Sequence, residues 1–336
     1  MRAVRWHGRD DVRLDEVPVP VPADGQVVLR VEAAAICGTD VDEVRFGPIN
    51  VPVEPHPVSG RSAPITLGHE IVGVVAGRGS GAGVATGQRV APWPSQPCGR
   101  CRDCASGHAN RCARMVALGM AVDGGMADEL VVDADRCVPV GADVELERAV
   151  LVEPFAVALH GAHQVELADR RVAVVGVGSL GLCMLEVALW AGAREVIAVS
   201  RTETARDAAV EVGASAAVLP DAAGDLDADV VFETAGAAPA VTASIAAARR
   251  GGQVVILGGH PGATGVDLHD LVWREIAVLG SMSHCQTDFA DAARAIGAGE
   301  LARARRRVEL APLEAGPELL RRDGGSTKRI LVPSLS

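Results

Sequence analysis

The segment that most constrains the fold is RRVAVVGVGSLGLCMLEVALWAGAREVIAVS, at residues 170–200. It contains an apolar run, three closely spaced glycines, a long apolar stretch and a second apolar run, which predicts strand, turn, helix and strand. The pattern continues with predicted helices at 205–214 and 239–252 and further Val- and Ile-rich strands. Strands of this kind alternating with helices are typical of a parallel sheet covered on both faces. We therefore expect an α/β doubly wound domain over residues 154–284.

The glycines of GVGSLG, residues 176–181, fit the pattern GxGxxG. Gly176 would make the tight turn, Gly178 would let the backbone approach a pyrophosphate, and Gly181 would pack the helix on the strand. Ser179 and Leu180 would begin the helix, whose free N–H groups attract phosphate. Because the pattern follows a strand and opens a helix, it predicts a dinucleotide site. The alternative is a glycine-rich turn without a ligand.

The end of the second strand indicates which dinucleotide would bind. An Asp or Glu at this position usually accepts a hydrogen bond from the ribose 2′-OH of NAD. Here Ser200 and Arg201 occupy it, and such a pair favours a 2′-phosphate. The sequence therefore predicts NADP(H) over NAD(H). In the alternative interpretation, Arg201 stacks on the adenine or points into water.

Residues 1–153 contain many short predicted strands separated by Gly and Pro, which indicates a β-rich, barrel-like domain. Residues 285–336 begin with a predicted helix and end with a predicted strand. We expect this last segment to rejoin the first domain.

Four cysteines lie close together in a lobe at about residues 93–115. Their spacing suits one tetrahedral Zn²⁺, and a site closed by four thiolates is structural because no position remains for substrate. An iron–sulfur cluster is the competing interpretation. The four are Cys98, Cys101, Cys104 and Cys112.

A second, dispersed set of metal-ligand residue types consists of Cys37, His69, Glu70 and Glu153. A catalytic zinc keeps three protein ligands and one open position. Taken singly, however, Cys37 is more often a core thiol, His69 a turn residue and Glu153 a helix N-terminal acid. Spacing alone does not join them.

The chain resembles the zinc-dependent medium-chain dehydrogenase/reductase (alcohol dehydrogenase) family over essentially its whole length. The matching motifs are CGTD (37–40), GHE (68–70), the four-cysteine lobe, VEP (152–154) and GVGSLG (176–181), in the family order. The segment 46–70 is most similar to the butanediol and sorbitol dehydrogenase branch. The resemblance implies a GroES-like catalytic domain, a Rossmann domain, and oxidation of secondary alcohols or reduction of ketones.

The resemblance also implies roles for individual residues. Cys37, His69 and a carboxylate from Glu70 or Glu153 would hold the catalytic zinc, which with the structural ion makes two Zn²⁺ per chain. Thr39 would pass the substrate proton toward solvent. The family commonly has a histidine three residues after this threonine, and here Asp42 stands in its place. Asp42 either accepts the proton or is only a helix-start acid.

The remaining histidines fall into two groups. By analogy with the family, three would lie near the cleft: His56, His160 and His284. Five are more often surface or packing residues: His7, His108, His163, His260 and His269. Three aromatic residues are candidates for the substrate pocket: Phe46, Trp93 and Phe155.

Two absences narrow the chemistry. The chain has no tyrosine, which excludes a tyrosine–lysine proton-transfer pair, and its only lysine is Lys328 in the predicted closing strand. Schiff-base chemistry would have to use that residue.

The net charge of −11 argues against nucleic-acid or anionic-membrane binding. The cysteine pattern and the lack of an apolar leader predict a cytoplasmic protein. We expect a small-molecule substrate, namely a secondary alcohol, diol, polyol or amino-polyol with its ketone, and a homodimer or homotetramer. The alternatives are the same chemistry with NAD(H), or a non-catalytic dinucleotide-binding protein of the same fold.

Overall fold

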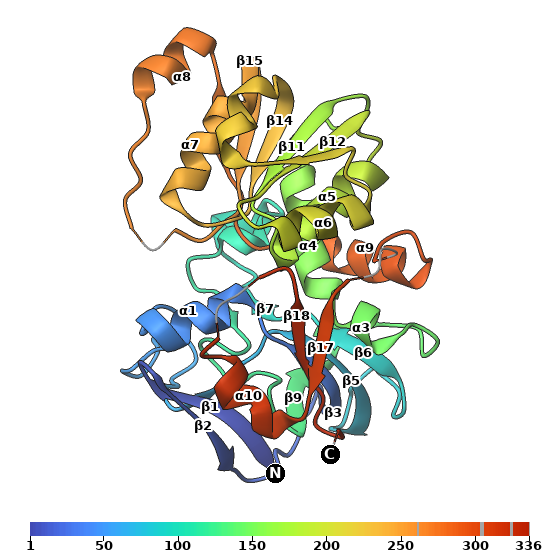
Figure 1. The fold of residues 1–336 in the computed structure, drawn as a ribbon. Helices are drawn as coiled ribbons and strands as arrows, with labels where there is room; N and C mark the ends of the chain where they lie inside the picture. The colour runs from blue at the N-terminus through green and yellow to red at the C-terminus, as the bar shows by residue number, and fades with distance from the viewer. Residues whose placement is uncertain (261, 303–305, 323–324, 336) are drawn as a thin grey trace.

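The computed structural model describes residues 1–260, 262–302, 306–322 and 325–335. These residues form a mainly antiparallel β domain and a parallel-sheet α/β domain, and both ends of the chain lie in the β domain (Figure 1). The fold class predicted from the sequence is thereby confirmed. In these ranges no helix combines the length and the apolar character needed to cross a membrane.

The β domain is built around a seven-stranded sheet in which β9 pairs with β3 beside the main path. The strands along that path are β10 (Cys137–Pro139), β6 (Arg89–Pro92), β5 (Glu70–Arg78), β3 (Gln26–Ala35), β18 (Lys328–Leu331) and β17 (Val308–Ala311), with β9 at Glu129–Asp133. Two small sheets complete the domain: β2 (Asp11–Glu16), β1 (Arg2–Gly8) and β4 (Ile65–Thr66), and the pair β7 (Ser95–Gln96) and β8 (Val116–Ala117).

The C-terminal segment lies against the β domain. β18 pairs antiparallel with β3, with Ile330 opposite Ala35, and parallel with β17. This pairing supports the expectation that residues 285–336 rejoin the first domain, while the exact domain boundaries stay a prediction.

The α/β domain contains a six-stranded sheet whose neighbouring strands are all parallel. The order is β13 (Ala216–Val218), β12 (Glu195–Val199), β11 (Arg171–Val175), β14 (Ala228–Glu233), β15 (Ala248–Ile256) and β16 (Ala277–Gly280). This is the 3-2-1-4-5-6 order of the doubly wound fold, in which ligands bind where the strand order reverses. That point lies between β11 and β14.

Helices cover both faces of this sheet and join it to the β domain (Figure 1). The α-helices of the described residues, in both domains, are α1 (Gly38–Phe46), α2 (Arg102–Ala105), α3 (Leu146–Ala149), α4 (Val152–Ala162), α5 (Ser179–Trp190), α6 (Glu203–Val212), α7 (Ala238–Ala247), α8 (Leu268–Arg274), α9 (Gln286–Gly297) and α10 (Gly316–Leu319). α4 packs against α5 and α9. One apolar core joins Val72 of the β domain, Phe155 of α4 and Phe232 of β14, so the two domains meet on the helix that carries Glu153.

One predicted element is shorter than expected. The helix predicted for residues 239–252 ends at Ala247, and Ala248 already belongs to β15, opposite Ala228 of β14. Pairing with β14 outweighs the local helical preference of this alanine-rich segment.

Candidate active site and metal centres

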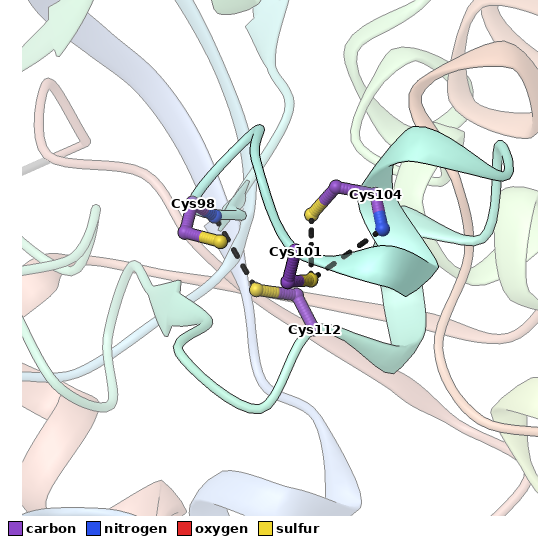
Figure 2. Close-up of side chains that lie close together, drawn as sticks. All are labelled: Cys98, Cys101, Cys104 and Cys112. Carbon is purple, nitrogen blue, oxygen red and sulfur yellow. Dashed lines mark hydrogen bonds between the residues drawn. The ribbon is translucent and has the colours of Figure 1, made fainter.

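The four-cysteine lobe brings its sulfur atoms together around one point (Figure 2). The Cys101 and Cys104 sulfurs are 3.4 Å apart, and the backbone N–H of Cys98 donates to the Cys112 sulfur at 3.3 Å. The ligand atoms of all four lie within 4.8 Å of one another, and none forms a disulfide. Backbone N–H groups of Arg100 and Cys101 donate to the Cys98 sulfur and lower its pKa to about 6.

This arrangement fits a tetrahedral zinc ion. With zinc–sulfur bonds of about 2.3 Å, sulfurs at tetrahedral corners lie roughly 3.8 Å apart, close to the spacing seen here. All four positions are taken by protein sulfurs. The residues therefore suit a structural ion rather than a reacting one.

A second cluster unites Cys37, His69 and Glu70, whose ligand atoms also lie within 4.8 Å of one another. Cys37 is the residue before α1, and Glu70 begins β5 opposite Ala35 of β3. Antiparallel pairing of β3 and β5 therefore places the two motifs side by side, although Cys37 and Glu70 are 33 positions apart in the sequence.

The backbone conformation at Gly68 explains why the GHE motif begins with glycine. Its φ of +96° lies in the left-handed region, and a Cβ there would come within 2.7 Å of the Met126 side chain. Only glycine makes this turn without strain. The turn delivers His69 to the end of β5.

Glu70 is paired with the only lysine of the chain. Lys328 Nζ lies 2.5 Å from Glu70 Oε2, and the two side chains are 4% and 2% exposed. Burial raises the pKa of Glu70, although the Lys328 ammonium opposes this shift. Because its ammonium is engaged by a buried carboxylate, Lys328 is not a free amine for Schiff-base chemistry.

Glu153, in the first turn of α4, has a different partner. Its Oε1 lies 3.2 Å from His284 Nε2, and His284 Nδ1 lies 3.2 Å from the indole nitrogen of Trp93. Burial alone would raise the pKa of Glu153, but the hydrogen bond from His284 and nearby positive groups hold it below its usual range. The negative charges of Glu70 and Glu153 lie near enough to influence each other.

The donor set at this second cluster fits a catalytic zinc. One thiol, one imidazole and one carboxylate converge there, and three protein ligands are the number a catalytic zinc keeps. The buried Nδ1 of His69 makes no hydrogen bond and lies 3.6 Å from Asp40 Oδ1. Burial disfavours a charged imidazole, but Asp40 and Cys37 outweigh it and raise the pKa of His69 well above its usual range. This strong local negative charge suits a divalent cation.

The two predicted relay residues occupy α1. Thr39 Oγ1 lies 3.6 Å from the Cys37 sulfur, so the hydroxyl stands beside the cluster. Asp42 is exposed on the same helix. The structure thus places Thr39 at the site, while the role of Asp42 stays a prediction.

The glycine loop connects β11 to α5 at the reversal point of the sheet. Gly176 has φ +98°, and a Cβ at Gly181 would lie 2.0 Å from the Gly176 carbonyl oxygen. By contrast, a Cβ at Gly178 would meet only the Gly325 carbonyl oxygen, at 3.8 Å. The backbone at Gly178 is therefore open, and Ser179 and Leu180 begin α5 directly after it.

Ser200 and Arg201 follow the end of β12, and Arg201 is exposed. Sequence reasoning missed Arg206 on α6, whose Nη1 donates to the carbonyl oxygens of Ser200 and Arg201 at 2.9 and 3.0 Å. A second guanidinium therefore lies at this turn. The signal available in the sequence was the position of Arg206, five residues after Arg201.

Of the three histidines predicted near the cleft, His284 contacts a candidate zinc ligand. His56 instead accepts hydrogen bonds from the backbone of its own turn, at Val58 and Ser59. The other five histidines contact residues outside the two candidate zinc sites: Asp15 (His7), Ser106 (His108), Asp288 (His163), Glu233 (His260) and Trp273 (His269).

His160 belongs to a polar junction between the cysteine lobe, α4 and α9. Its Nδ1 lies 2.9 Å from Asp288 Oδ2 and its Nε2 lies 3.0 Å from Asn110 Nδ2, while Cys285 donates to Asn110 Oδ1. Hydrogen bonds from His160, His163 and the Cys285 backbone outweigh burial and hold the pKa of Asp288 well below its usual range. Both ring nitrogens of His160 are thus engaged, and the junction ties the lobe to the helices.

Comparisons with known proteins agree with this architecture. Residues 23–142 match the model for the alcohol dehydrogenase GroES-like domain, and residues 179–298 match the model for zinc-binding dehydrogenase. The chain is 31% identical to a 2-dehydro-3-deoxy-L-galactonate 5-dehydrogenase of Pseudoalteromonas atlantica, covering 90% of this chain and 89% of that protein. It is 32% identical to an (R,R)-butanediol dehydrogenase of Bacillus subtilis, covering 84% and 85%.

Solved structures show the same fold. A protein classed as a zinc-binding dehydrogenase from Sinorhizobium meliloti, bound to NADP, superposes with a TM-score of 0.88 at 31% identity and covers 99% of both chains. L-idonate 5-dehydrogenase of Escherichia coli gives a TM-score of 0.87 at 26% identity, covering 98% and 97%. With both domain models matched and relatives above 30% identity along most of its length, the chain belongs to the zinc-dependent medium-chain dehydrogenase (alcohol dehydrogenase) family.

Proposed function

We propose that this protein transfers a hydride between a secondary alcohol and its ketone, with NADP(H) as the preferred nicotinamide cofactor. The observation that carries the proposal is the convergence of Cys37, His69 and Glu70 beside Thr39. Relatives that are named for butanediol and a deoxy-galactonate, and a similar fold named for idonate, support a diol, polyol or amino-polyol as substrate.

In this proposal Cys37, His69 and a carboxylate from Glu70 or Glu153 hold the catalytic zinc. The bound ion would act as a Lewis acid that lowers the pKa of the substrate hydroxyl. The glycine loop at residues 176–181 would hold the nicotinamide cofactor, whose chemistry is hydride transfer. The convergence of Glu70 with Cys37 and His69 favours Glu70 as the direct ligand, with Glu153 joining by exchange or through water.

Residues of α1 would carry away the proton that alcohol oxidation releases. The Thr39 hydroxyl, next to the ligand Cys37, would accept this proton and pass it outward. The exposed carboxylate of Asp42, three residues further along α1, would receive the proton, or the proton would pass directly to water.

The test is a turnover screen of diols, polyols and aminocyclitols with both cofactors, on the wild type and on Cys37→Ala. We expect Cys37→Ala to fold, to keep its structural zinc and to lose turnover. An active Cys37→Ala enzyme with unchanged metal content would refute the site. A wild type that binds NADP(H) but oxidises or reduces none of these compounds would favour the non-catalytic alternative.

The preference for NADP(H) rests on the turn at Ser200 and Arg201. No carboxylate side chain stands at Ser200 or Arg201 to accept from a ribose 2′-OH, and Arg206 adds positive charge beneath the turn. An arginine–phosphate contact is worth roughly 1.5–3 kcal/mol. Arg201→Ala should therefore weaken NADP(H) by about 10- to 150-fold and leave NAD(H) almost unchanged.

Two further variants sharpen that measurement. Ser200→Asp should reverse the preference, because a carboxylate repels the phosphate and accepts from a free 2′-OH. Arg194→Ala is the matched control, since this exposed arginine precedes the opposite end of β12. A wild type that already prefers NAD(H), or an Arg201→Ala enzyme weakened equally for both cofactors, contradicts the assignment.

We also propose that the protein works as a homodimer or homotetramer in the cytoplasm. Strand β16 is one of the two edge strands of the parallel sheet. Exposed apolar side chains gather on it and on α8: Leu268, Val272, Trp273 and Val278. A patch of this kind at a sheet edge favours self-association. Light scattering on the wild type and on Trp273→Lys tests it, and a monomeric wild type refutes it.

A further inference from the structure

His284 lies between two buried groups that come from distant parts of the chain. Trp93 follows β6, Glu153 lies in the first turn of α4, and His284 lies two residues before α9. The His284 ring is fully buried and stacks on Phe289, with ring centroids 5.5 Å apart. Its two nitrogens each have one partner at 3.2 Å, the indole nitrogen of Trp93 and Oε1 of Glu153.

These contacts determine where the ring carries its proton. An indole N–H only donates a hydrogen bond, so His284 Nδ1 must accept and carries no proton. The ring proton is then on Nε2 and is donated to Glu153 Oε1. An imidazolium would place a second N–H against the indole N–H at 3.2 Å, so the network assigns the neutral ring with this single tautomer.

The indole is itself held in place. The Arg136 guanidinium lies 5.5 Å from the centroid of the Trp93 ring, and Arg136 Nη1 donates to the Ser95 carbonyl oxygen at 2.7 Å. The backbone N–H of Trp93 also donates to the Arg136 carbonyl oxygen at 2.8 Å. Trp93 therefore presents its N–H from a fixed position.

We propose that Trp93 and His284 are positioning residues for Glu153. Trp93 selects the tautomer of His284, and His284 in turn holds Oε1 of Glu153, so that Oε2 is left to serve the catalytic zinc. Hydrogen bonds of this kind to a metal site orient its ligands and typically contribute 10- to 100-fold to metal affinity. This proposal rests on the proposed zinc-dependent function. It assigns to Trp93 and His284 the orientation of Glu153, the second carboxylate of the proposed zinc site.

The tautomer is tested by nuclear magnetic resonance on zinc-loaded protein labelled with ¹⁵N-histidine. The signals of His284 are those lost in His284→Gln, and two-bond ¹H–¹⁵N correlations show which nitrogen carries the proton. We expect the proton on Nε2 in the wild type and a mixture of forms in Trp93→Phe, which lacks the indole N–H. A proton on Nδ1, or on both nitrogens, in the wild type overturns the inference.

The effect on the metal is tested by the rate at which a chelator removes zinc. Cys37→Ala identifies which phase of release belongs to the catalytic site, and the slower cysteine-lobe phase is an internal reference. We expect His284→Leu to release the catalytic-site zinc about 10- to 100-fold faster. His284→Gln should stay near the wild type, because its side-chain amide keeps an N–H donor for Glu153.

Matched controls are His269→Leu and Trp190→Phe, which change exposed residues of the same types on α8 and α5 and should leave both phases unchanged. If His284→Leu keeps its zinc as long as the wild type, or if His284→Gln loses it as fast as His284→Leu, the inference is wrong. Failure of the proposed function is a different result: the wild type would then show no zinc phase that Cys37→Ala removes.

Discussion

Replacing Lys328 by methionine removes a buried positive charge while preserving most of the side-chain volume. In the wild type its ammonium lies 2.5 Å from Glu70 Oε2 and also donates to the Ile36 carbonyl oxygen at 3.3 Å. Both charged side chains are almost completely buried. Lys328→Met therefore leaves the Glu70 carboxylate in the interior, close to the negative charge of Glu153, without its cation.

The expected cost follows from that geometry. Breaking a buried ion pair by removing one partner typically destabilises a protein by about 3–5 kcal/mol, because the remaining charge stays buried and unpaired. A zinc ion held by Cys37, His69 and Glu70 would supply a second cation for the same carboxylate. We therefore expect the full loss in a Cys37→Ala background, and a smaller loss in the zinc-loaded wild-type background.

The assay is urea unfolding followed by tryptophan fluorescence, at equal zinc concentration in both backgrounds. Lys328→Arg is the charge-retaining control and should recover most of the stability. Glu70→Gln with Lys328→Met removes both charges, so its cost should be well below the sum of the two single changes. Strictly additive costs, or a loss below about 1 kcal/mol for Lys328→Met in both backgrounds, would refute the coupling between the two residues.

Three further outcomes are expected. Cys101→Ser should destabilise or aggregate the protein, because the binding free energy of a structural zinc is partly folding free energy; metal analysis and thermal unfolding check this. Thr39→Ala should lower kcat by roughly 10²- to 10⁴-fold with cofactor affinity unchanged, whereas Thr39→Ser should retain much of the activity. The hydrogen bond to Asp288 raises the pKa of His163, so this stabilisation is present below about pH 6.5 and is lost as the pH rises through the folded-state value. His163→Gln, at a half-exposed position, should thus cost about 0.2–1 kcal/mol at pH 6 and less at pH 8.5, measured by urea unfolding.

The parts of the fold that were predictable have local signals. The segment at 170–200 contains the apolar runs and glycines that predict strand, turn and helix without reference to the rest of the chain. The structure has β11, the turn and α5 there. Candidate ligands such as Cys37 and Glu70 were also visible, because they stand at the ends of predicted elements. The end of α7 was not predictable in this way, since it depends on the pairing of Ala248 with Ala228 of another strand.

Local sequence patterns do not predict which side chains contact Glu153. Trp93 and His284 are 191 positions apart, and His284 and Glu153 are 131 positions apart. Only the packing of α4 and α9 against the β domain brings these residues together. No periodic pattern in the sequence predicts that packing. His284 was expected near the cleft by analogy alone, and Trp93 only as a pocket residue.

Lys328 is an intermediate case, because the sequence held a usable signal for it. A lysine inside a strand with the sequence KRIL is at odds with the rule that lysines are almost never fully buried unless they are paired. All four residues of β18 are in fact buried. A buried lysine requires a carboxylate, and the antiparallel pairing of β18 with β3, which also pairs with β5, puts Glu70 within reach. The requirement for a partner was therefore predictable from the sequence, whereas the choice of Glu70 among the acidic residues is set by sheet register.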